Sequence, residues 1–537
     1  MKNFSVTLLL VLLSMTANKA LAYEIAVENG DNVTIYYNYI NDGKELEVTT
    51  QNGSAGSGYE SVTKLSIPAT VTYMGQTRPV TSIGYWAFQN CTSLTSVDIP
   101  NTVTAIGWSA FQNCSGLTSI EIPNSVKSVG GDAFVGCSGL QKVIVRDLDA
   151  WCKIDFVSPS ATPLRYAKHL YSDENTEITN LVIPNSVTSI ARDAFLECES
   201  ITSVEIGNSV TEIGQEAFKK CKNLSSVKMS NSVKSIAFFA FEGCSSLTSV
   251  EIPKSVTSIA NFAFMTCPSI ESIKVDEGNT NYDSRDNCNA IIETATNSLR
   301  AGCKNTVIPI GVESIGGTAF VGCSGLTSIE IPNTLTKIEG TPFAGCELQK
   351  VIVRDLSAWC RINFETGSCN PLCFSGHLYS DENTEIKALV IPDDVTYISQ
   401  NAFRDASCLN SVTIPEGVTS IGSNAFNFSN DNEQVNIYSY ILEPTSNTGS
   451  SFSNKIYNSA TLHIPQGTIE RYKATTGWKK FVNIVEDIPS EILTIPNSSA
   501  PKELFCYSVT GTKITSPQRG INIIRMSDGT TKKMVVK

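Results

Sequence analysis

The chain has 537 residues, 41% of them hydrophobic, and a net charge of −12. Removal of residues 1–22, which contain Lys2 and Lys19 and no acidic residue, would leave a net charge of −14. A strongly acidic chain has no basic stripe to replace the counterions of phosphate groups, so composition excludes nucleic acid as a partner.

Residues 1–22 have the features of a secretory signal peptide. Lys2 supplies the positive start, Val6–Met15 the apolar core and Ala20-Leu21-Ala22 an A-x-A cleavage site. No later apolar run approaches the roughly 20 residues that a membrane helix needs. We therefore expect an exported chain without a transmembrane segment after cleavage.

Residues 23–60 predict an N-terminal β cap. Val33, Ile35, Tyr37 and Tyr39 alternate with more polar residues, which is typical of a strand with one buried face. We expect this segment to cover the first unit of the repeated region that follows.

A single pattern then recurs over residues 61–435 at a step of 23 residues. Cys91, Cys114 and Cys137 keep this step, and an Ala-Phe pair, a Leu and an Ile-Pro pair keep it with them. A fixed period in the range of about 20–30 residues indicates a solenoid, in which one coil alone cannot bury its apolar side. The anchoring Phe recurs as Phe88, Phe111, Phe134, Phe195, Phe218, Phe241, Phe264, Phe320, Phe343, Phe403 and Phe426.

Each coil predicts two short strands joined by an inward turn. In the coil 103–123, a strand over 103–106 ends at Gly107, and Ala110-Phe111 suits one helical turn. A second strand over 118–122 follows. Stacked coils would form a parallel sheet along one face, with apolar and aromatic ladders beneath it.

Three longer variants interrupt the period, at 140–183, 276–308 and 348–391. The first and third share the run Leu-Gln-Lys-Val-Ile-Val-Arg-Asp-Leu, and Trp151 and Trp359 within them are offset by 208 residues. This offset indicates a duplicated block.

The second variant is symmetric about Ala295-Thr296 and predicts a hairpin. The expected cross-strand pairs are Cys288/Cys303, Ala290/Ala301 and Ile292/Leu299. Cys288 and Cys303 would then form a disulfide or remain as two buried thiols.

The end of the chain departs from the period. Residues 436–487 predict a C-terminal cap with a short helix over 468–480, since solenoid ends need covering. Residues 488–537 predict a small β tail.

Most of the 17 Cys mark the repeat. Successive coils would place them roughly 4.8 Å apart with parallel side chains, which suits disulfide geometry poorly. We therefore predict a ladder of small buried thiols.

Outward positions of the second strand form two predicted columns. Glu205, Lys228, Glu251 and Lys274 alternate in sign on adjacent coils, which fits a cross-strand charge ladder, a polar recognition strip, or both. The candidate binding surface comprises Ser96, Asp98, Ser119, Glu121, Ser203, Glu205, Ser226, Lys228, Ser249, Glu251, Lys274 and Glu330.

Catalytic patterns are missing from the sequence. It has three His, two of them in the duplicated block, and no H-E-x-x-H or G-x-S-x-G motif. We predict no catalytic, cofactor-binding or metal-binding residue.

The repeat resembles a known family. The run Val-Thr-Ser-Ile-Gly-x-x-Ala-Phe-x-x-Cys-x-x-Leu-Thr-Ser-Val-x-Ile-Pro over 80–100, and again from Ser255, resembles the BspA-like leucine-rich repeats. The resemblance extends over about 63–426. It implies a leucine-rich-repeat solenoid on a bacterial surface or in the secreted fraction, with roles in adhesion to host matrix and in coaggregation, and no enzymatic activity.

The tail carries a second resemblance. Tyr507-Ser-Val-Thr-Gly-Thr-Lys and the run from Arg519 are similar to C-terminal sorting domains of the type IX secretion system. This resemblance implies a route of export.

These observations favour a non-enzymatic adhesin or interaction scaffold. Its sheet face and variant-coil loops would bind an extracellular protein or glycan, on host matrix or on another cell. The alternatives are a passive envelope component and an extracellular polymer-degrading enzyme with its site in the coils of Trp151 and Trp359.

Overall fold

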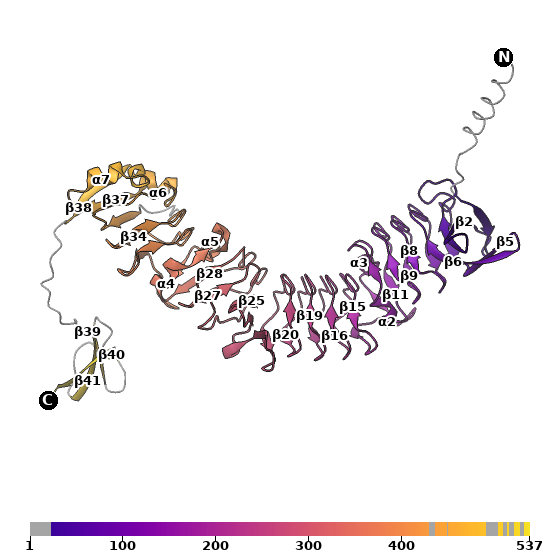
Figure 1. Ribbon diagram of the computed structural model, residues 1–537, viewed down its shortest axis with the longest axis horizontal. Coiled ribbons are helices and arrows are strands. Elements are labelled where there is room, and N and C mark those ends of the chain that lie inside the picture. The colour runs from indigo at the N-terminus through magenta and orange to yellow at the C-terminus, as the bar shows by residue number, and fades with distance from the viewer. Residues whose placement is uncertain are drawn as a thin grey trace, which may run out of the picture.

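The computed structural model describes residues 23–428, 435–447 and 449–489, and the backbone of four strands between 503 and 536. The expected signal peptide, residues 1–22, lies outside the described residues. The repeated coils stack into a solenoid that curves into an arc (Figure 1). Two rows of parallel strands run along this arc, and the core lies between them.

The inner row lies toward the hollow of the arc (Figure 1) and consists of two-residue strands. Successive strands pair in register, as Ile213 does with Ile236. The inner strands are β8 (Ala105–Ile106), β10 (Ser128–Val129), β12 (Asp155–Phe156), β15 (Ser189–Ile190), β17 (Glu212–Ile213), β19 (Ser235–Ile236), β21 (Ser258–Ile259), β26 (Ser314–Ile315), β28 (Lys337–Ile338), β30 (Asn363–Phe364), β33 (Tyr397–Ile398) and β35 (Ser420–Ile421).

The outer row is also parallel, and it pairs Ser203 with Ser226 and Glu205 with Lys228. The pairing is parallel because each coil repeats the path of the preceding one, so equivalent strands of successive coils run in the same direction. The outer strands are β4 (Lys64–Ser66), β7 (Ser96–Asp98), β9 (Ser119–Glu121), β11 (Lys142–Ile144), β13 (Leu170–Tyr171), β14 (Asn180–Val182), β16 (Ser203–Glu205), β18 (Ser226–Lys228), β20 (Ser249–Ile252), β22 (Ser272–Val275), β27 (Ser328–Ile331), β29 (Lys350–Val353), β31 (Leu378–Tyr379), β32 (Ala388–Val390) and β34 (Ser411–Ile414).

The core is built of ladders, as the period predicts. The rings of Phe218 and Phe241 stack with centroids 5.4 Å apart and an interplanar angle of 3°. The Cys114 thiol donates a hydrogen bond of 3.0 Å to the Phe88 carbonyl of the preceding coil. All 16 cysteines among the described residues are free. The prediction of aromatic and thiol ladders is confirmed.

The inward turn differs from the helical turn predicted at Ala110-Phe111. Ser109 and Asn113 have φ values of 53° and 61°. Left-handed residues on both sides of the pair cannot continue a right-handed helix. The segment is therefore a series of tight turns that points Phe111 into the core, and the helical prediction is wrong.

Short helices occur in the long coils. Trp151 and Trp359 are buried, and each indole donates a hydrogen bond of 2.9 Å, to the carbonyls of Ala194 and Ala402 respectively. Donors and acceptors are both offset by 208 residues, so the duplication extends to packing. The helices are α2 (Leu148–Trp151), α3 (Leu164–Ala167), α4 (Leu356–Arg361) and α5 (Leu372–Ser375), with a 3₁₀ turn η2 (Gly367–Cys369).

The predicted hairpin is present within 276–308. It consists of β23 (Tyr282–Asp283), η1 (Arg285–Asn287), β24 (Ala290–Glu293) and β25 (Ser298–Gly302). Ile292 pairs with Leu299 as predicted, but a bulge between Ile291 and Ile292 pairs Ala290 with Gly302 instead of Ala301.

The two thiols of the hairpin contact different carbonyls. The Cys303 thiol points to the Asn289 carbonyl at 3.5 Å, whereas the Cys288 thiol lies 3.9 Å from the Ala290 carbonyl. Both cysteines are buried and free. The structure thus corresponds to the alternative of two buried thiols, and the pairing of Cys288 with Cys303 across the hairpin is not observed.

Both ends of the arc are covered. The helix predicted over 468–480 is divided, because α7 ends at Ala474, where the next residue, Thr475, has an extended backbone, and a 3₁₀ turn begins only at Trp478. The N-terminal strands are β1 (Ile25–Glu28), β2 (Thr34–Ile40), β3 (Glu45–Thr49), β5 (Thr70–Tyr73) and β6 (Gln76–Ile83); the C-terminal elements are β36 (Asn436–Ser439), α6 (Asn454–Ser459), β37 (Thr461–Pro465), α7 (Ile469–Ala474), η3 (Trp478–Lys480) and β38 (Asn483–Ile488).

The tail forms its own antiparallel sheet in the order β40-β39-β41-β42. Its strands are β39 (Glu503–Ser508), β40 (Lys513–Ile514), β41 (Gly520–Met526) and β42 (Thr531–Val536).

Candidate binding surface

The structure brings the predicted surface residues together in two neighbouring columns on the outer row of strands. Ser203 and Ser226 lie side by side, as do Glu251 and Lys274. The Ser column contains Ser96, Ser119, Ser203, Ser226 and Ser249; the charged column contains Asp98, Glu121, Glu205, Lys228, Glu251, Lys274 and Glu330. All these side chains are exposed or half-buried.

Several charges in the second column have an opposite charge beside them. The Glu205 carboxylate lies 2.7 Å from the Lys228 ammonium. Glu121 and Glu330 instead pair with arginines of the long coils, Arg146 at 2.8 Å and Arg354 at 2.7 Å. Exposed pairs of this kind add little to stability, so the column is a partly neutralised polar strip.

In each long coil the arginine of this pair also contacts a second carboxylate. Arg146 binds Glu174 as well as Glu121, and Arg354 binds Glu382 as well as Glu330. The two carboxylates raise the pKa of the Arg146 guanidinium above its ordinary range. Because both copies of the long coil have this arrangement, we interpret these ion pairs as part of the fold of the long coil.

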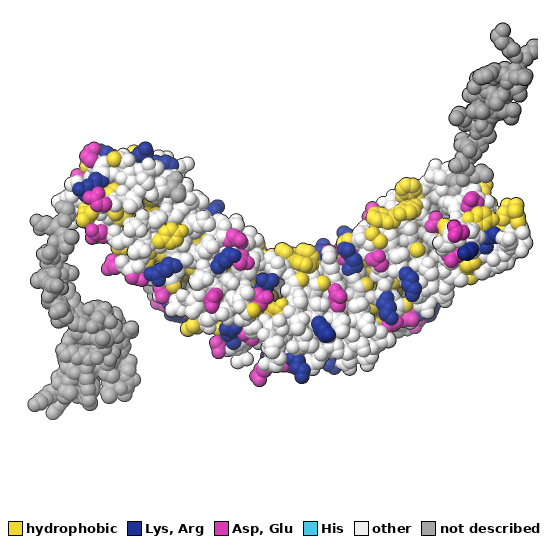
Figure 2. All heavy atoms as spheres, in the orientation of Figure 1, with side chains coloured by type: hydrophobic (Ala, Val, Ile, Leu, Met, Phe, Trp, Pro, Cys, Tyr) yellow, Lys and Arg dark blue, Asp and Glu magenta, His cyan; other side chains and the backbone are white. Residues whose placement is uncertain are grey.

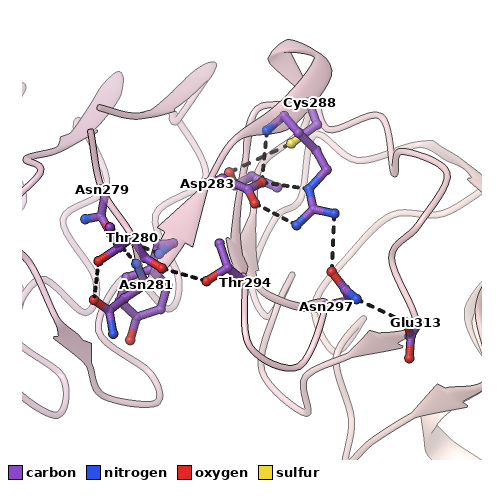
Figure 3. Close-up of polar contacts among 11 residues, drawn as sticks. Asn279, Thr280, Asn281, Asp283, Cys288, Thr294, Asn297 and Glu313 are labelled. Atoms are coloured by element: carbon purple, nitrogen blue, oxygen red, sulfur yellow. Dashed lines mark hydrogen bonds and ion pairs between the residues drawn. The ribbon is translucent and has the colours of Figure 1, made fainter. Parts of the chain in front are cut away.

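The hairpin presents a polar network on its exposed side (Figure 3). The Arg285 guanidinium donates to both oxygens of Asp283, at 2.9 and 2.6 Å, and to the Asn297 carbonyl oxygen at 3.2 Å. Asn297 in turn donates to Glu313 of the next coil at 3.0 Å. These bonds fix the hairpin to the array, so its side chains are already engaged within the chain.

Near the C-terminal end the outer face has an exposed valine and a stacked aromatic pair. Val390 is 58% exposed, and the ring of Tyr438 stacks on that of His463 at 4.5 Å. A groove of about 450 Å³ lies beside them, lined by residues that include Asp393, Glu416, Tyr440 and Pro465. Sequence reasoning did not predict this groove, because its walls come from separate coils.

Sequence reasoning also missed a set of exposed aromatic residues. Figure 2 shows hydrophobic side chains gathered on the hollow edge of the arc, above the regions where Figure 1 labels β8 and β19. Three residues separate the inner strand from the Ala-Phe pair, and in several coils the second or the third of them is an aromatic residue that is not fully buried. We call this set the aromatic row: Tyr85, Trp86, Trp108, Phe238, Phe239 and Phe262.

Among the residues that the structure describes, no group of three or more His, Cys, Asp or Glu side chains is placed to hold a metal ion. In the same part of the chain, no helix combines the length and the apolar character needed to span a bilayer.

Stacked parallel coils with buried Phe and Cys ladders define a leucine-rich-repeat solenoid. Residues 57–149, 169–291, 297–365 and 378–499 match the BspA type leucine rich repeat region, in 6 copies. These segments include most of the chain, which therefore belongs to the BspA-type leucine-rich-repeat family. Membership indicates a binding or scaffold role.

Solved structures of bacterial leucine-rich-repeat proteins resemble the chain. A leucine rich cell surface protein from Faecalibacterium prausnitzii is 27% identical, with a TM-score of 0.45, and the match covers 78% of this chain and 95% of that one. A leucine-rich repeat protein from Bacteroides ovatus is 24% identical, with a TM-score of 0.44 and coverage of 87% and 100%. The pneumococcal vaccine antigen PcpA is 18% identical, with a TM-score of 0.43 and coverage of 87% and 99%. No curated protein matches the chain.

Proposed function

We propose that the protein is an exported, cell-surface binding protein, an adhesin or interaction scaffold without enzymatic activity. It holds an extracellular protein or glycan, on host matrix or on another cell, against the solenoid. The observation that carries this proposal is the register of the outer strands, which places Ser203 beside Ser226 and Glu205 beside Lys228 on one exposed surface. A rigid sheet with repeated polar columns offers a large surface for a macromolecule.

The variant-coil loops give the surface its specificity in this proposal, since loops on a rigid scaffold commonly carry recognition. The purified chain from residue 23 would be tested for binding to immobilised host matrix proteins and to whole bacterial cells. We expect exchange of the exposed residues in loops 155–168 and 364–376 for Ser or Asn to weaken binding without changing the melting temperature. Unchanged binding would refute recognition by the loops, and no binding above an albumin control would favour a passive envelope component.

We propose export because residues 1–22 resemble a signal peptide and the tail, residues 488–537, resembles type IX sorting domains. The intact mass of the protein recovered from the producing bacterium tests both ends. A mature chain that starts at Tyr23 is expected, and a chain that retains Met1 would contradict export through a cleaved signal peptide.

A further inference from the structure

One position of the repeat has a backbone conformation that bulky residues disfavour. The third residue after the inner strand has a left-handed backbone, and Asp132 and Asn401 occupy it with φ values of 58° and 61°. Asn and Asp tolerate this conformation, whereas larger side chains meet the neighbouring backbone. Trp86, Phe239 and Phe262 nevertheless occupy the same position, with φ values of 57°, 60° and 64°.

The core does not account for these aromatic residues. Tyr85 is 60% exposed, Trp86 50%, Trp108 43% and Phe238 49%. Single exposed hydrophobic residues are common on proteins, but a group at two adjacent positions of the repeat is not. Trp86 combines a left-handed backbone with an exposed side chain, which indicates a role in binding.

The neighbouring coil leaves room for the indole of Trp108. At Gly131, a Cβ atom would meet the ring of Trp108 at 2.5 Å, so only Gly lets the indole lie across the next coil. Tyr85 and Trp86 lie edge to face, with ring centroids 6.3 Å apart and an interplanar angle of 63°. Together these three aromatic residues form the first platform of the row.

Neutral amides accompany this first platform. Gln89 closes a turn on Trp86 through a backbone bond of 3.0 Å, and its side-chain amide donates to that of Gln112 in the next coil. Asn113 donates to Asn90 at 2.9 Å in the same way. The platform and its amide ladder thus carry no charge, although the whole chain has a net charge of −12.

We propose that the aromatic row binds a neutral polysaccharide, which lies along the hollow edge of the arc. This inference rests on the proposed function and names its ligand class. Aromatic faces attract the C–H bonds of sugar rings because the ring faces are electron-rich. Side-chain amides both donate and accept hydrogen bonds, as sugar hydroxyls do.

The second platform lies several coils further along the same edge. The rings of Phe239 and Phe262 stack at 5.0 Å, and Phe238 beside them is exposed. Lys219 lies over Phe239, with its ammonium 4.8 Å from the ring centroid, and it also pairs with Glu216 and Glu242. A chain-like ligand can contact both platforms, whereas a single small sugar can contact only one.

Other ligand classes fit the row less well. An anionic polymer needs basic side chains, and the first platform has none. Protein hot spots commonly combine Trp or Tyr with Arg in a closed pocket, whereas this platform is open and lacks Arg.

Affinity electrophoresis tests the inference on the full chain from residue 23. Native gels would contain a linear β-glucan, xylan, mannan or dextran, with heparin as an anionic comparison. We expect at least one neutral polysaccharide to retard the protein. A triple variant, Tyr85→Ser with Trp86→Asn and Trp108→Ser, should lose about tenfold or more in affinity.

The matched control is Met74→Ser, which removes a side chain 85% exposed and outside the row. It should migrate like the unaltered protein. Melting temperatures show whether each variant is folded. The single variant Trp86→Asn should have the same melting temperature as the unaltered protein or a higher one, because Asn suits the left-handed backbone.

Absence of retardation by all four neutral polysaccharides, or equal retardation of the triple variant, overturns the inference. If matrix proteins bind and polysaccharides do not, the ligand inference fails while the proposed function stands. If neither binds, both fail.

Discussion

The ring of Phe241 stacks on that of Phe264 in the next coil at 5.5 Å and an interplanar angle of 1°. Two residues earlier in each coil, Phe239 and Phe262 form a second stack that is not fully buried. The same residue type thus serves the core at one position of the repeat and the surface at another.

This difference in position predicts different effects on stability. Phe241→Ala should lower the free energy of unfolding by about 3–5 kcal/mol, because it opens a cavity in a buried stack. Phe238→Ala, at a side chain 49% exposed, should change it by no more than about 0.5 kcal/mol. Urea unfolding measures both variants, and hydrogen exchange shows whether the loss is confined to neighbouring coils. Equal losses in the two variants would contradict the assignment of Phe241 to the core and Phe238 to the surface.

The duplicated tryptophans predict additive effects. Trp151→Phe removes the indole donor from the Ala194 carbonyl, and Trp359→Phe does the same at Ala402. Loss of the indole donor at the buried Ala194 carbonyl costs about 1–3 kcal/mol. The Ala402 carbonyl keeps a hydrogen bond of 3.0 Å from the Asn370 amide, so Trp359→Phe should cost less than Trp151→Phe. The two sites share no contacts, so the double variant should lose the sum of the two within about 0.5 kcal/mol. A clearly smaller loss in thermal unfolding experiments would show that the two sites are energetically coupled.

A buried carboxyl predicts a dependence of stability on pH. Asp193 is fully buried, and burial, together with the nearby Glu216, raises its pKa from 3.8 to about 6. The folded protein therefore holds a proton between about pH 4 and 6 that the unfolded chain releases. The contribution of Asp193 to the free energy of unfolding is therefore fully present below about pH 4 and is lost as the pH rises through 6.

Asp193→Asn removes this titration and keeps a side chain suited to the local φ of 58°. The variant should gain stability relative to the unaltered protein between pH 4 and 6, by no more than about 1.4 kcal/mol per pH unit. Urea midpoints measured at pH 4, 5, 6 and 7 give the difference curve. Two parallel curves would show that Asp193 is ionised throughout.

The period of the repeat explains which features the sequence could predict. Cys114 and Phe111 recur with their neighbours, so their burial and stacking follow from one spacing. The bulge at Ile291 has no such signal, because it depends on how the hairpin meets the adjacent coil. The aromatic row was missed for a related reason: an apolar residue such as Trp108 is expected in the core, and only the structure shows that its side chain is exposed. The C-terminal groove depends on side chains from several coils and has no local pattern.

The thiol ladder predicts a loss of stability in alkali. Burial raises the pKa of Cys137 and Cys267 from 9.0 to about 12, and each thiol donates to a Phe carbonyl of the preceding coil, at 3.1 and 3.2 Å. Unfolded thiols ionise above about pH 9, whereas the folded ones stay protonated. Stability is therefore fully present below pH 9 and falls as the pH rises from 9 toward 12, by up to about 1.4 kcal/mol per pH unit for each thiol.

Chemical modification measures the same property. At pH 8 iodoacetamide should leave the ladder thiols of the native protein unmodified and alkylate them in urea, because the thiolate is the reactive form and burial excludes the reagent. Cys137→Ala serves as the matched control, since it removes one thiol and should make the decline in stability between pH 9 and 12 less steep. Rapid alkylation of native Cys137 would contradict a closed ladder, and an unchanged slope in Cys137→Ala would show that this thiol does not cause the alkaline loss.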